Sequence, residues 1–136
     1  MAGLSEALRD KEFCLLTTFK KNGDSVSTVM WFALRGETVY LTTRGQSWKM
    51  KRIRREPQVT IGWSSSSGSS RGKFFEATAT EVLDPEERES AIRLLNKKYG
   101  LKKRLMDFGL RFAKDKTEAV IRVEAHGLLG QEFTNL

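Results

Sequence analysis

The dipeptide Asn22-Gly23 lies between two stretches of strand-forming residues and constrains the fold more than any other local feature. A two-residue hairpin turn needs a positive φ at both central residues, and Asn followed by Gly adopts that geometry readily. Residues 12–19 and 25–34 are therefore predicted to pair as antiparallel strands. A further glycine turn leads into a strand over 38–43, so this part of the chain is expected to form an antiparallel meander.

The rest of the chain adds more strands and a few helices. Apolar alternation or continuous apolar runs predict further strands over 58–63, 73–83 and 117–125. Capping residues and apolar residues at helical spacing predict helices over 3–11, 47–56, 85–99 and 101–114. Six strands without a regular alternation of strand and helix predict a mainly β, antiparallel barrel or sandwich rather than a Rossmann sheet. The length of 136 residues predicts one domain over 1–136.

Composition excludes several classes of protein. The single cysteine, Cys14, cannot form an internal disulfide, and with the single histidine, His126, it cannot complete a zinc site. No apolar run approaches the roughly 18 residues of a membrane span, and the N-terminus lacks a signal-peptide pattern, so a cytoplasmic protein is expected. The formal net charge of +7 favours a polyanionic partner: a nucleic acid, an anionic membrane surface or a phosphorylated cofactor.

The segment from Thr42 to Arg55 contains six basic residues and no acidic one. Thr42 and Thr43 end a predicted strand, a glycine turn follows, and Ser47 is predicted to cap a helix. The first N–H groups of a helix lack partners within it, and the positive end of its dipole lies there. This segment is therefore predicted to bind an anion such as phosphate.

Two readings of this basic helix remain open from the residues alone. Lys49 lies at the second helical position and Arg52 follows on the same face, so both can reach an anion at the helix start. Alternatively, the cations are a solvated surface, with Trp48 and Ile53 packed beneath it. The composition of the segment does not separate these two interpretations.

Two strings of residues resemble a known family. VYLTTRGQSWKMKRIRREPQVTIGW resembles the signature region of the pyridoxamine 5′-phosphate oxidase-like, FMN-binding split-barrel flavoproteins. In that region a strand ending in Thr leads through a turn to Ser-x-Lys, a short helix, an acid–Pro pair and another strand. GDSVSTVMWF resembles the family segment that runs past the cofactor ring. The order of elements matches over nearly the whole chain, and the resemblance implies a six-stranded antiparallel split β-barrel that forms homodimers.

The resemblance also implies a cofactor site, residue by residue. The residues implied to bind the cofactor are Thr28, Val29, Met30, Trp31, Thr42, Thr43, Arg44, Ser47, Trp48, Lys49, Arg52 and Lys73. Those between 28 and 31 would lie along the ring, and most of the others would hold or approach the phosphate. Lys73 or Arg71 would reach the phosphate bound by the partner subunit. The chain ends in HGLLGQEFTNL without the arginines of pyridoxamine phosphate oxidases proper, so oxidation of pyridoxamine phosphate is not expected.

The length and the SWKMKRIRREP pattern resemble the branch of this family that binds the deazaflavin coenzyme F-420. Its lactyl-oligoglutamate tail carries several carboxylates, which the cations between Lys49 and Arg55 could follow; FMN is the alternative cofactor. The resemblance implies hydride transfer between the cofactor and a small organic acceptor. Because the cofactor carries the chemistry, no catalytic protein acid or base and no metal are expected.

Two other classes of function compete with this one. The same fold could bind a flavin or a haem without catalysis. The KMKRIRR helix could instead bind nucleic acid, although no nucleic-acid-binding motif accompanies the charge. Among single residues, Cys14 is expected in the core, His126 at the surface, and the three tryptophans in the core or at a subunit interface.

Overall fold

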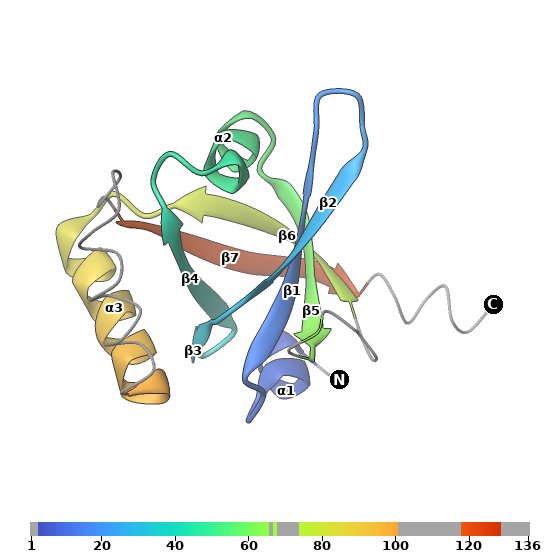
Figure 1. The fold of residues 1–136 in the computed structure, drawn as a ribbon. Coiled ribbons are helices and arrows are strands. Elements are labelled where there is room, and N and C mark those ends of the chain that lie inside the picture. Colours follow the sequence, from blue (N-terminus) through green and yellow to red (C-terminus); the bar gives the residue numbers. More distant parts are fainter. Residues whose placement is uncertain (1–2, 66, 68–73, 101–117, 129–136) are drawn as a thin grey trace.

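The computed structural model describes residues 3–65, 67, 74–100 and 118–128 (Figure 1). The predicted helix over 101–114, together with Lys73 and Arg71, lies outside the described residues. The described elements are, in order, α1 (Leu4–Leu8), β1 (Phe13–Phe19), β2 (Ser25–Met30), β3 (Ala33–Arg35), β4 (Thr38–Arg44), α2 (Trp48–Arg55), β5 (Gln58–Ser64), β6 (Phe74–Glu81), α3 (Pro85–Tyr99) and β7 (Glu118–Leu128). The expectation of a mainly β protein with accessory helices is confirmed.

All seven described strands belong to one antiparallel sheet, in the order β2-β1-β5-β6-β7-β4-β3. The hairpin between β1 and β2 is confirmed, but its turn differs from the predicted one. The Lys20 N–H donates to Asp24 O, which closes a loop of three residues. Within that loop Gly23 alone has a positive φ, of 92°. The Asn22 side chain accepts the Asp24 N–H instead of adopting a positive φ itself.

The predicted continuous strand over 25–34 is wrong, because the chain leaves the sheet at Trp31 and Phe32. The Phe32 N–H donates to the Tyr99 hydroxyl at 2.9 Å, and that hydroxyl also lies 2.9 Å from Phe32 O. A side chain from α3 thereby takes the backbone groups that a neighbouring strand would otherwise pair. The sheet consequently has seven described strands rather than six.

The sheet curls without closing into a barrel. Its two edge strands, β2 and β3, are separated by only two residues in the chain, so the sheet must bend to bring its ends together. No ladder of hydrogen bonds joins β2 to β3 in the described part of the chain. The expected six-stranded split barrel is therefore corrected to an open, curled sheet of seven strands.

Two apolar layers hold the sheet. The inner layer is built by residues that face into the curl and by α1 and α2: Leu4, Leu8, Leu16, Leu41, Met50, Ile53, Ile61, Ile121 and Val123 are among its buried members. On the other face, α3 covers Tyr40 and Val120 with Ala91. The predicted inward residues of β7 are buried, and Val120 on its opposite face is buried as well. Cys14 is fully buried as expected, and burial raises the pKa of its thiol to about 12.

The predicted start of α3 is confirmed in detail. The Asp84 carboxylate accepts the Glu87 N–H at 2.9 Å, and Pro85 occupies the first helical position. The helix ends before Gly100, which has a φ of 54°. Helix α1 is shorter than predicted. In the described residues, no helix has both the length and the apolar character needed to cross a membrane.

Glu87 joins α3 to the sheet and should make stability depend on pH. The Tyr40 hydroxyl donates to its carboxylate at 2.7 Å, and Arg122 Nη1 lies 2.8 and 2.9 Å from its two oxygens. The Tyr40 hydrogen bond, and then that from Arg122, lower the pKa of the Glu87 carboxyl. A carboxyl with a depressed folded-state pKa stabilises the fold above its unfolded pKa, and this contribution is lost as pH falls through the folded-state pKa.

We therefore expect Glu87→Gln to lower the free energy of unfolding at pH 7, and the two proteins to converge as pH falls below the ordinary pKa of a glutamate and then through the lowered pKa of Glu87. Urea unfolding at a series of pH values measures this. Glu86→Gln is the control, because it removes the same charge from an exposed position in the same helical turn. If both variants differ from the wild type by the same amount at every pH, the Glu87 contacts do not stabilise the fold.

Candidate functional site

The link from β4 to α2 forms the start of the candidate site. The Ser47 N–H donates to Arg44 O at 3.1 Å, which closes the turn, and the Ser47 hydroxyl accepts the Met50 N–H at 3.2 Å. Ser47 is thus the N-cap of α2, as predicted. The N–H groups of Trp48 and Lys49 have no acceptor within the helix, because they belong to its first turn. These donors are available to an anion.

A cavity of about 510 Å³ opens at this helix start. Its lining contains three basic residues and no acidic one: Arg44, Gln46, Ser47, Trp48, Lys49 and Arg52. Lys49 is half-buried, and burial, followed by the nearby charge of Arg52, lowers the pKa of its ammonium. Among the described residues, no carboxylate pairs with Lys49 or Arg52. The cavity therefore concentrates positive charge that the described protein does not neutralise.

Arg52 connects this cavity to β1 and β2. Its Nε donates to Thr18 Oγ1 at 2.8 Å, and Thr18 is buried on β1. Thr18 pairs with Val26 across the hairpin, and the next two pairs on that face are Leu16 with Thr28 and Cys14 with Met30. Cross-strand partners project to the same face of a sheet. The predicted ring-contacting residues Thr28 and Met30 thus face the same side as the hydroxyl that binds Arg52.

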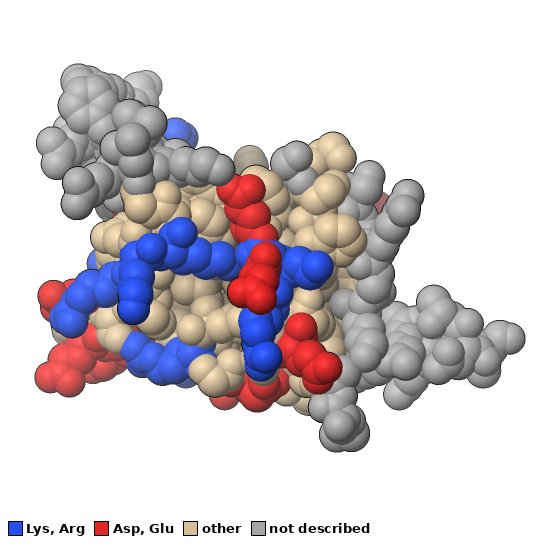
Figure 2. Space-filling model, turned by 90° about the horizontal axis from the view of Figure 1, so that it is seen from below, with Lys and Arg blue, Asp and Glu red and all other residues tan. Residues whose placement is uncertain are grey.

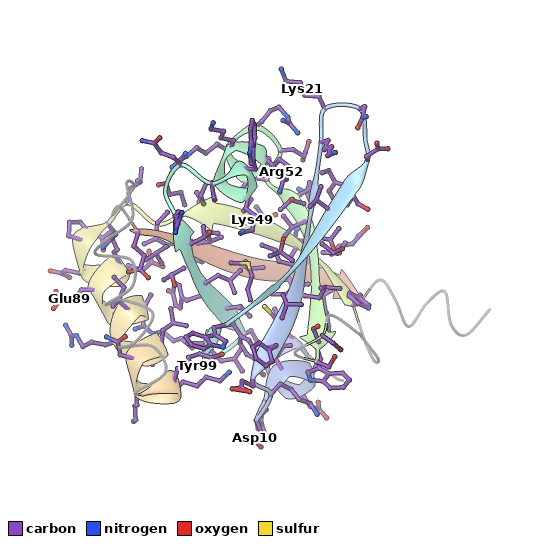
Figure 3. All side chains as sticks on the ribbon, viewed as in Figure 1. Asp10, Lys21, Lys49, Arg52, Glu89 and Tyr99 are labelled. Atoms are coloured by element: carbon purple, nitrogen blue, oxygen red, sulfur yellow. The ribbon has the colours of Figure 1, made fainter. Side chains whose placement is uncertain are left out.

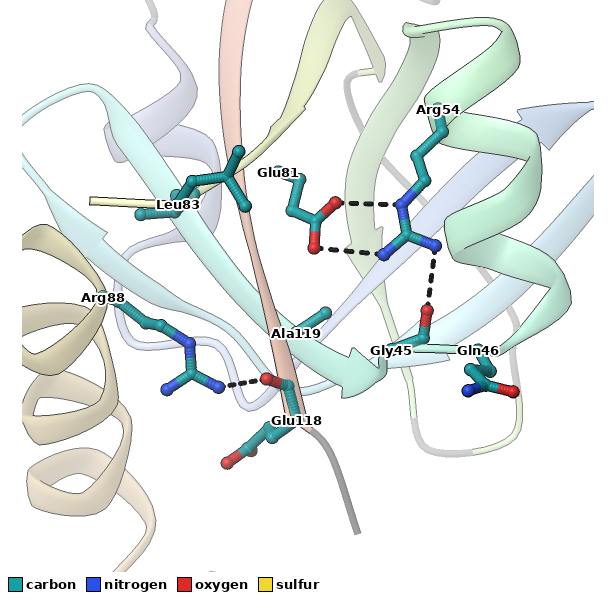
Figure 4. A pocket seen from close by; sticks show the side chains of 9 residues that line it. Gly45, Gln46, Arg54, Glu81, Leu83, Arg88, Glu118 and Ala119 are labelled. Carbon is teal, nitrogen blue, oxygen red and sulfur yellow. Dashed lines mark hydrogen bonds and ion pairs between the residues drawn. The ribbon is translucent and has the colours of Figure 1, made fainter. Parts of the chain in front are cut away.

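The other cations of α2 have different partners. Arg54 forms two hydrogen bonds with the Glu81 carboxylate, at 2.9 and 3.1 Å, and one with Gly45 O at 3.0 Å (Figure 4). Arg55 donates to Phe19 O at 2.6 Å. These two arginines tie α2 to β6 and to the β1–β2 hairpin. The cations between Lys49 and Arg55, which were expected to follow the cofactor's tail together, thus include residues that face the cavity and residues that hold the helix in place.

Figure 4 looks into a second hollow, of about 350 Å³, on the other side of the turn at Gly45. The ion pair of Arg54 with Glu81 lies in its wall, and Arg88 donates to Glu118 O across it. Its arginines are engaged by the protein's own acceptors. The hollow therefore differs from the cavity at α2, whose Lys49 has no such acceptor among the described residues.

Thr43 reaches the helix start beside the cavity, whereas Thr42 does not. Thr43 Oγ1 lies 3.5 Å from Ser47 Oγ, close to the helix start. Thr42 pairs with Val120, which packs under α3, so its side chain projects from the opposite face of the sheet. Consecutive residues of a strand face opposite sides, and both hydroxyls therefore cannot meet one phosphate.

Two predicted ring neighbours also lie elsewhere. Val29 pairs with Leu15 on the outer face of the hairpin. Trp31 stacks on Tyr99 with ring centroids 4.5 Å apart and an interplanar angle of 13°. Figure 3 shows Lys49 and Arg52 in the upper half of the view, close to α2, and Tyr99 in the lower half. Trp31 is thus held by α3 and not by the cavity at α2.

Trp48 is not packed beneath α2. Its side chain is 72% exposed and lines the cavity, with Lys51 Nζ 4.5 Å from its ring centroid. Ile53 and Met50 are the residues of α2 that enter the core. The solvated-surface interpretation is correct for Ile53 and wrong for Trp48. Of the two positions expected for Trp48, the core is wrong and the subunit interface stays a prediction.

The described part of the face opposite α2 has no concentration of positive charge like that of the cavity. Figure 2 shows the face opposite α2, where basic and acidic side chains lie next to one another. His126 is exposed, as expected, and its Nε2 lies 2.7 Å from Thr78 Oγ1. A cluster of cations at the start of α2 that lacks carboxylate partners among the described residues can bind a dianion. On the face in Figure 2, by contrast, neighbouring charges of opposite sign neutralise each other.

Sequence reasoning missed Thr18 and Gln46. The signal for Thr18 was present, because it continues the buried alternation of Cys14 and Leu16 along β1. A hydroxyl at such a position requires a partner. Gln46 lines the cavity from the turn, and no local pattern distinguishes it from other turn residues.

Comparison with models of protein families shows which family the chain belongs to. Residues 3–129 match the family model described as pyridoxamine 5′-phosphate oxidase. The chain therefore belongs to the pyridoxamine 5′-phosphate oxidase family. No curated protein gives a significant match.

Three solved structures share the fold over 86–98% of their own length. HutZ, the heme storage protein from Vibrio cholerae, is 18% identical, with a TM-score of 0.69 and 94% of each chain covered. An F-420 reductase is 19% identical, with a TM-score of 0.62, and covers 95% of this chain and 98% of its own. A FAD-binding protein from Mesorhizobium loti is 13% identical, with a TM-score of 0.65, covering 91% of this chain and 86% of its own. At these identities the likeness concerns the fold.

Proposed function

We propose that the protein binds a phosphorylated flavin-type cofactor at the start of α2 and transfers a hydride between it and a small organic acceptor. The observation that carries this proposal is Lys49: a half-buried ammonium in a cavity without acidic lining, beside the first N–H groups of a helix. A half-buried cation without a carboxylate partner is costly unless an anion compensates it. Membership of the pyridoxamine 5′-phosphate oxidase family supports a flavin-type ligand.

The residues of the cavity fit a phosphate. The Ser47 hydroxyl accepts the Met50 N–H, so its own proton is free to donate to a phosphate oxygen. Lys49 and Arg52 would add charge-assisted hydrogen bonds, with the N–H groups of Trp48 and Lys49 completing the shell. A bound dianion would also favour the charged form of Lys49, opposing the effect of burial on its pKa.

The ring would lie along the inner face of β2, beside Thr28 and Met30. When bound, a flavin or deazaflavin supplies the hydride-carrying ring, and the protein supplies position and exclusion of water. The backbone of Val29 would contact the ring even though its side chain faces outward. Arg52 would extend from the phosphate to Thr18 on β1, the strand that pairs with β2.

We favour the deazaflavin coenzyme F-420 over FMN as the cofactor. The neighbouring structures include an F-420 reductase of nearly the same length. Arg54 and Arg55 are held by other groups, so the oligoglutamate tail would meet Arg44, Lys51 and the exposed ring of Trp48. FMN needs the same phosphate contacts and no tail contacts.

We further propose that the chain is a single domain that forms homodimers, with the cofactor between two subunits. The exposure of Trp48 beside the cavity supports a dimer, because large aromatic side chains at a protein surface are enriched where subunits meet. Lys73 or Arg71 of the partner subunit would then contribute to the phosphate site.

A heme storage protein among the structural neighbours supports a second candidate, a binding module without catalysis. Turnover separates the two functions. Reoxidation of the bound reduced cofactor by an organic acceptor is expected of the oxidoreductase and not of the module.

Titration of the purified protein with F-420 and with FMN tests the proposal. We expect at least one dissociation constant below about 100 μM, which corresponds to about 5.5 kcal/mol of binding free energy. The absorption spectrum of any ligand that copurifies distinguishes deazaflavin, flavin and haem. Binding of neither phosphorylated cofactor below that concentration would rule the proposal out.

A further inference from the structure

We propose that Thr18 is a positioning residue for the phosphate site, and that its contact with Arg52 determines how strongly the protein prefers a phosphorylated ligand over the same ligand without phosphate. This inference rests on the proposed function. It concerns a residue of β1 that lines no part of the cavity at α2 and acts through Arg52.

The burial of Thr18 is the first observation. Its side chain is 1% exposed, and it is one of two buried polar residues in the described part of the chain, with Ser64. Its neighbours on the same face of β1 and β2 are Leu16 and Val26. Valine has nearly the same shape and carries no polar group, so packing alone does not explain a hydroxyl at this position.

The direction of the hydrogen bond is the second observation. Thr18 Oγ1 accepts from Nε of Arg52 at 2.8 Å and lies 3.5 Å from Val26 O, to which it can donate. The guanidinium is a planar fork, so holding Nε sets the orientation of both terminal nitrogens. No described carboxylate binds these nitrogens, and Arg52 lines the cavity beside Lys49. The contact therefore pre-organises two donors for an anion.

The contact also links the two halves of the proposed site. Arg52 belongs to α2, which would hold the phosphate, whereas Thr18 belongs to the hairpin that carries Thr28 and Met30. A ligand with a phosphate at the right distance from its ring would engage both halves. A ligand without phosphate would engage only the hairpin, so it would not depend on the orientation of Arg52.

The experiment compares FMN with riboflavin as probes, by fluorescence titration of the full chain. We expect the wild type to bind FMN more tightly than riboflavin. Thr18→Val should weaken FMN binding about tenfold and change riboflavin binding less than about twofold. Thr18→Ser keeps the hydroxyl and should retain the preference for FMN. Arg52→Lys keeps the charge without the fork and should lose the preference as Thr18→Val does.

Coupling between the two residues is the decisive control. Once Arg52 is lysine, adding Thr18→Val should cause little further loss of FMN binding, because the lost orientation is already gone. Thermal unfolding shows whether each variant is folded, and Arg52→Lys tests the contact if Thr18→Val does not fold.

Three outcomes would overturn the inference without contradicting the proposed phosphate site. Thr18→Val could leave FMN binding unchanged, or it could weaken FMN and riboflavin equally, which indicates a general effect on the fold. Additive losses in the double variant would show that Thr18 does not act through Arg52. A wild type that binds FMN and riboflavin equally would instead contradict the proposed phosphate site itself, and with it this inference.

Discussion

Replacement of Lys49 by alanine is expected to weaken the binding of FMN and of F-420 by about 10- to 150-fold, or about 1.5–3 kcal/mol. The size follows from a charge-assisted hydrogen bond made by a half-buried ammonium, which water screens less than an exposed one. The substitution should have little effect on folding, because Lys49 has no hydrogen bond or ion pair with the other described residues. Isothermal titration with each cofactor measures the loss.

Lys51→Ala is the matched control for FMN. It removes the same charge from the same helix, at an exposed position outside the lining of the cavity. We expect it to change FMN affinity less than about twofold, because exposed charges near a site contribute mainly through screened fields. Equal losses in Lys49→Ala and Lys51→Ala would mean that net charge, and not a defined phosphate site, governs binding.

Replacement of Tyr99 by phenylalanine is expected to lower the free energy of unfolding by about 1–3 kcal/mol. The Tyr99 hydroxyl accepts the Phe32 N–H at 2.9 Å and lies 2.7 Å from Glu12 O, so it joins α3, the residue just before β1 and the break between β2 and β3. Its removal leaves a buried N–H without a partner. The stacking of Trp31 on the ring is retained in the variant, so the loss reports on the hydroxyl.

Thermal unfolding of Tyr99→Phe should show a melting temperature lower by about 3–10 °C. The second tyrosine of the chain provides the control. The Tyr40 hydroxyl donates to the Glu87 carboxylate, which is partly exposed, so Tyr40→Phe leaves the acceptor accessible to water and should cost less. A melting temperature of Tyr99→Phe equal to that of the wild type would show that the hydroxyl does not hold the break.

The local signals of the sequence were reliable where the atoms that satisfy them lie within a few residues. Ser47 caps α2 through the Met50 N–H, and Asp84 caps α3 through the Glu87 N–H. The hairpin at Gly23 also formed, although with a loop of three residues. In each case a side chain or a glycine meets backbone groups of the same turn.

The break at Phe32 could not be predicted in the same way. The segment 25–34 is rich in β-branched and aromatic residues that favour a strand, and the chain leaves the sheet because Tyr99, 67 residues away, takes the Phe32 backbone groups. The seventh strand of the described sheet is a consequence of this single contact. Strand propensity is a local property, so it cannot show that a side chain from a distant helix will bind these backbone groups.

The candidate site was also predicted only in part from the sequence. The segment from Thr42 to Arg55 was recognised as basic and as the start of a helix, so the place of the cavity followed from the sequence. The roles of the individual cations in this segment did not follow from the sequence. Arg54 meets Glu81, 27 residues away, and Arg55 meets Phe19 O, 36 residues away, which leaves Lys49 and Arg52 to face the cavity.

The sequence by itself determined the strand-rich class of this protein, the caps of its helices and the position of its basic helix, because short-range hydrogen bonding and alternation specify them. Tertiary structure alone decided where the long strand breaks, which threonine reaches the helix start and which cations remain without an acid. Those outcomes depend on partners brought together from distant parts of the chain, and no local pattern encodes the choice among them.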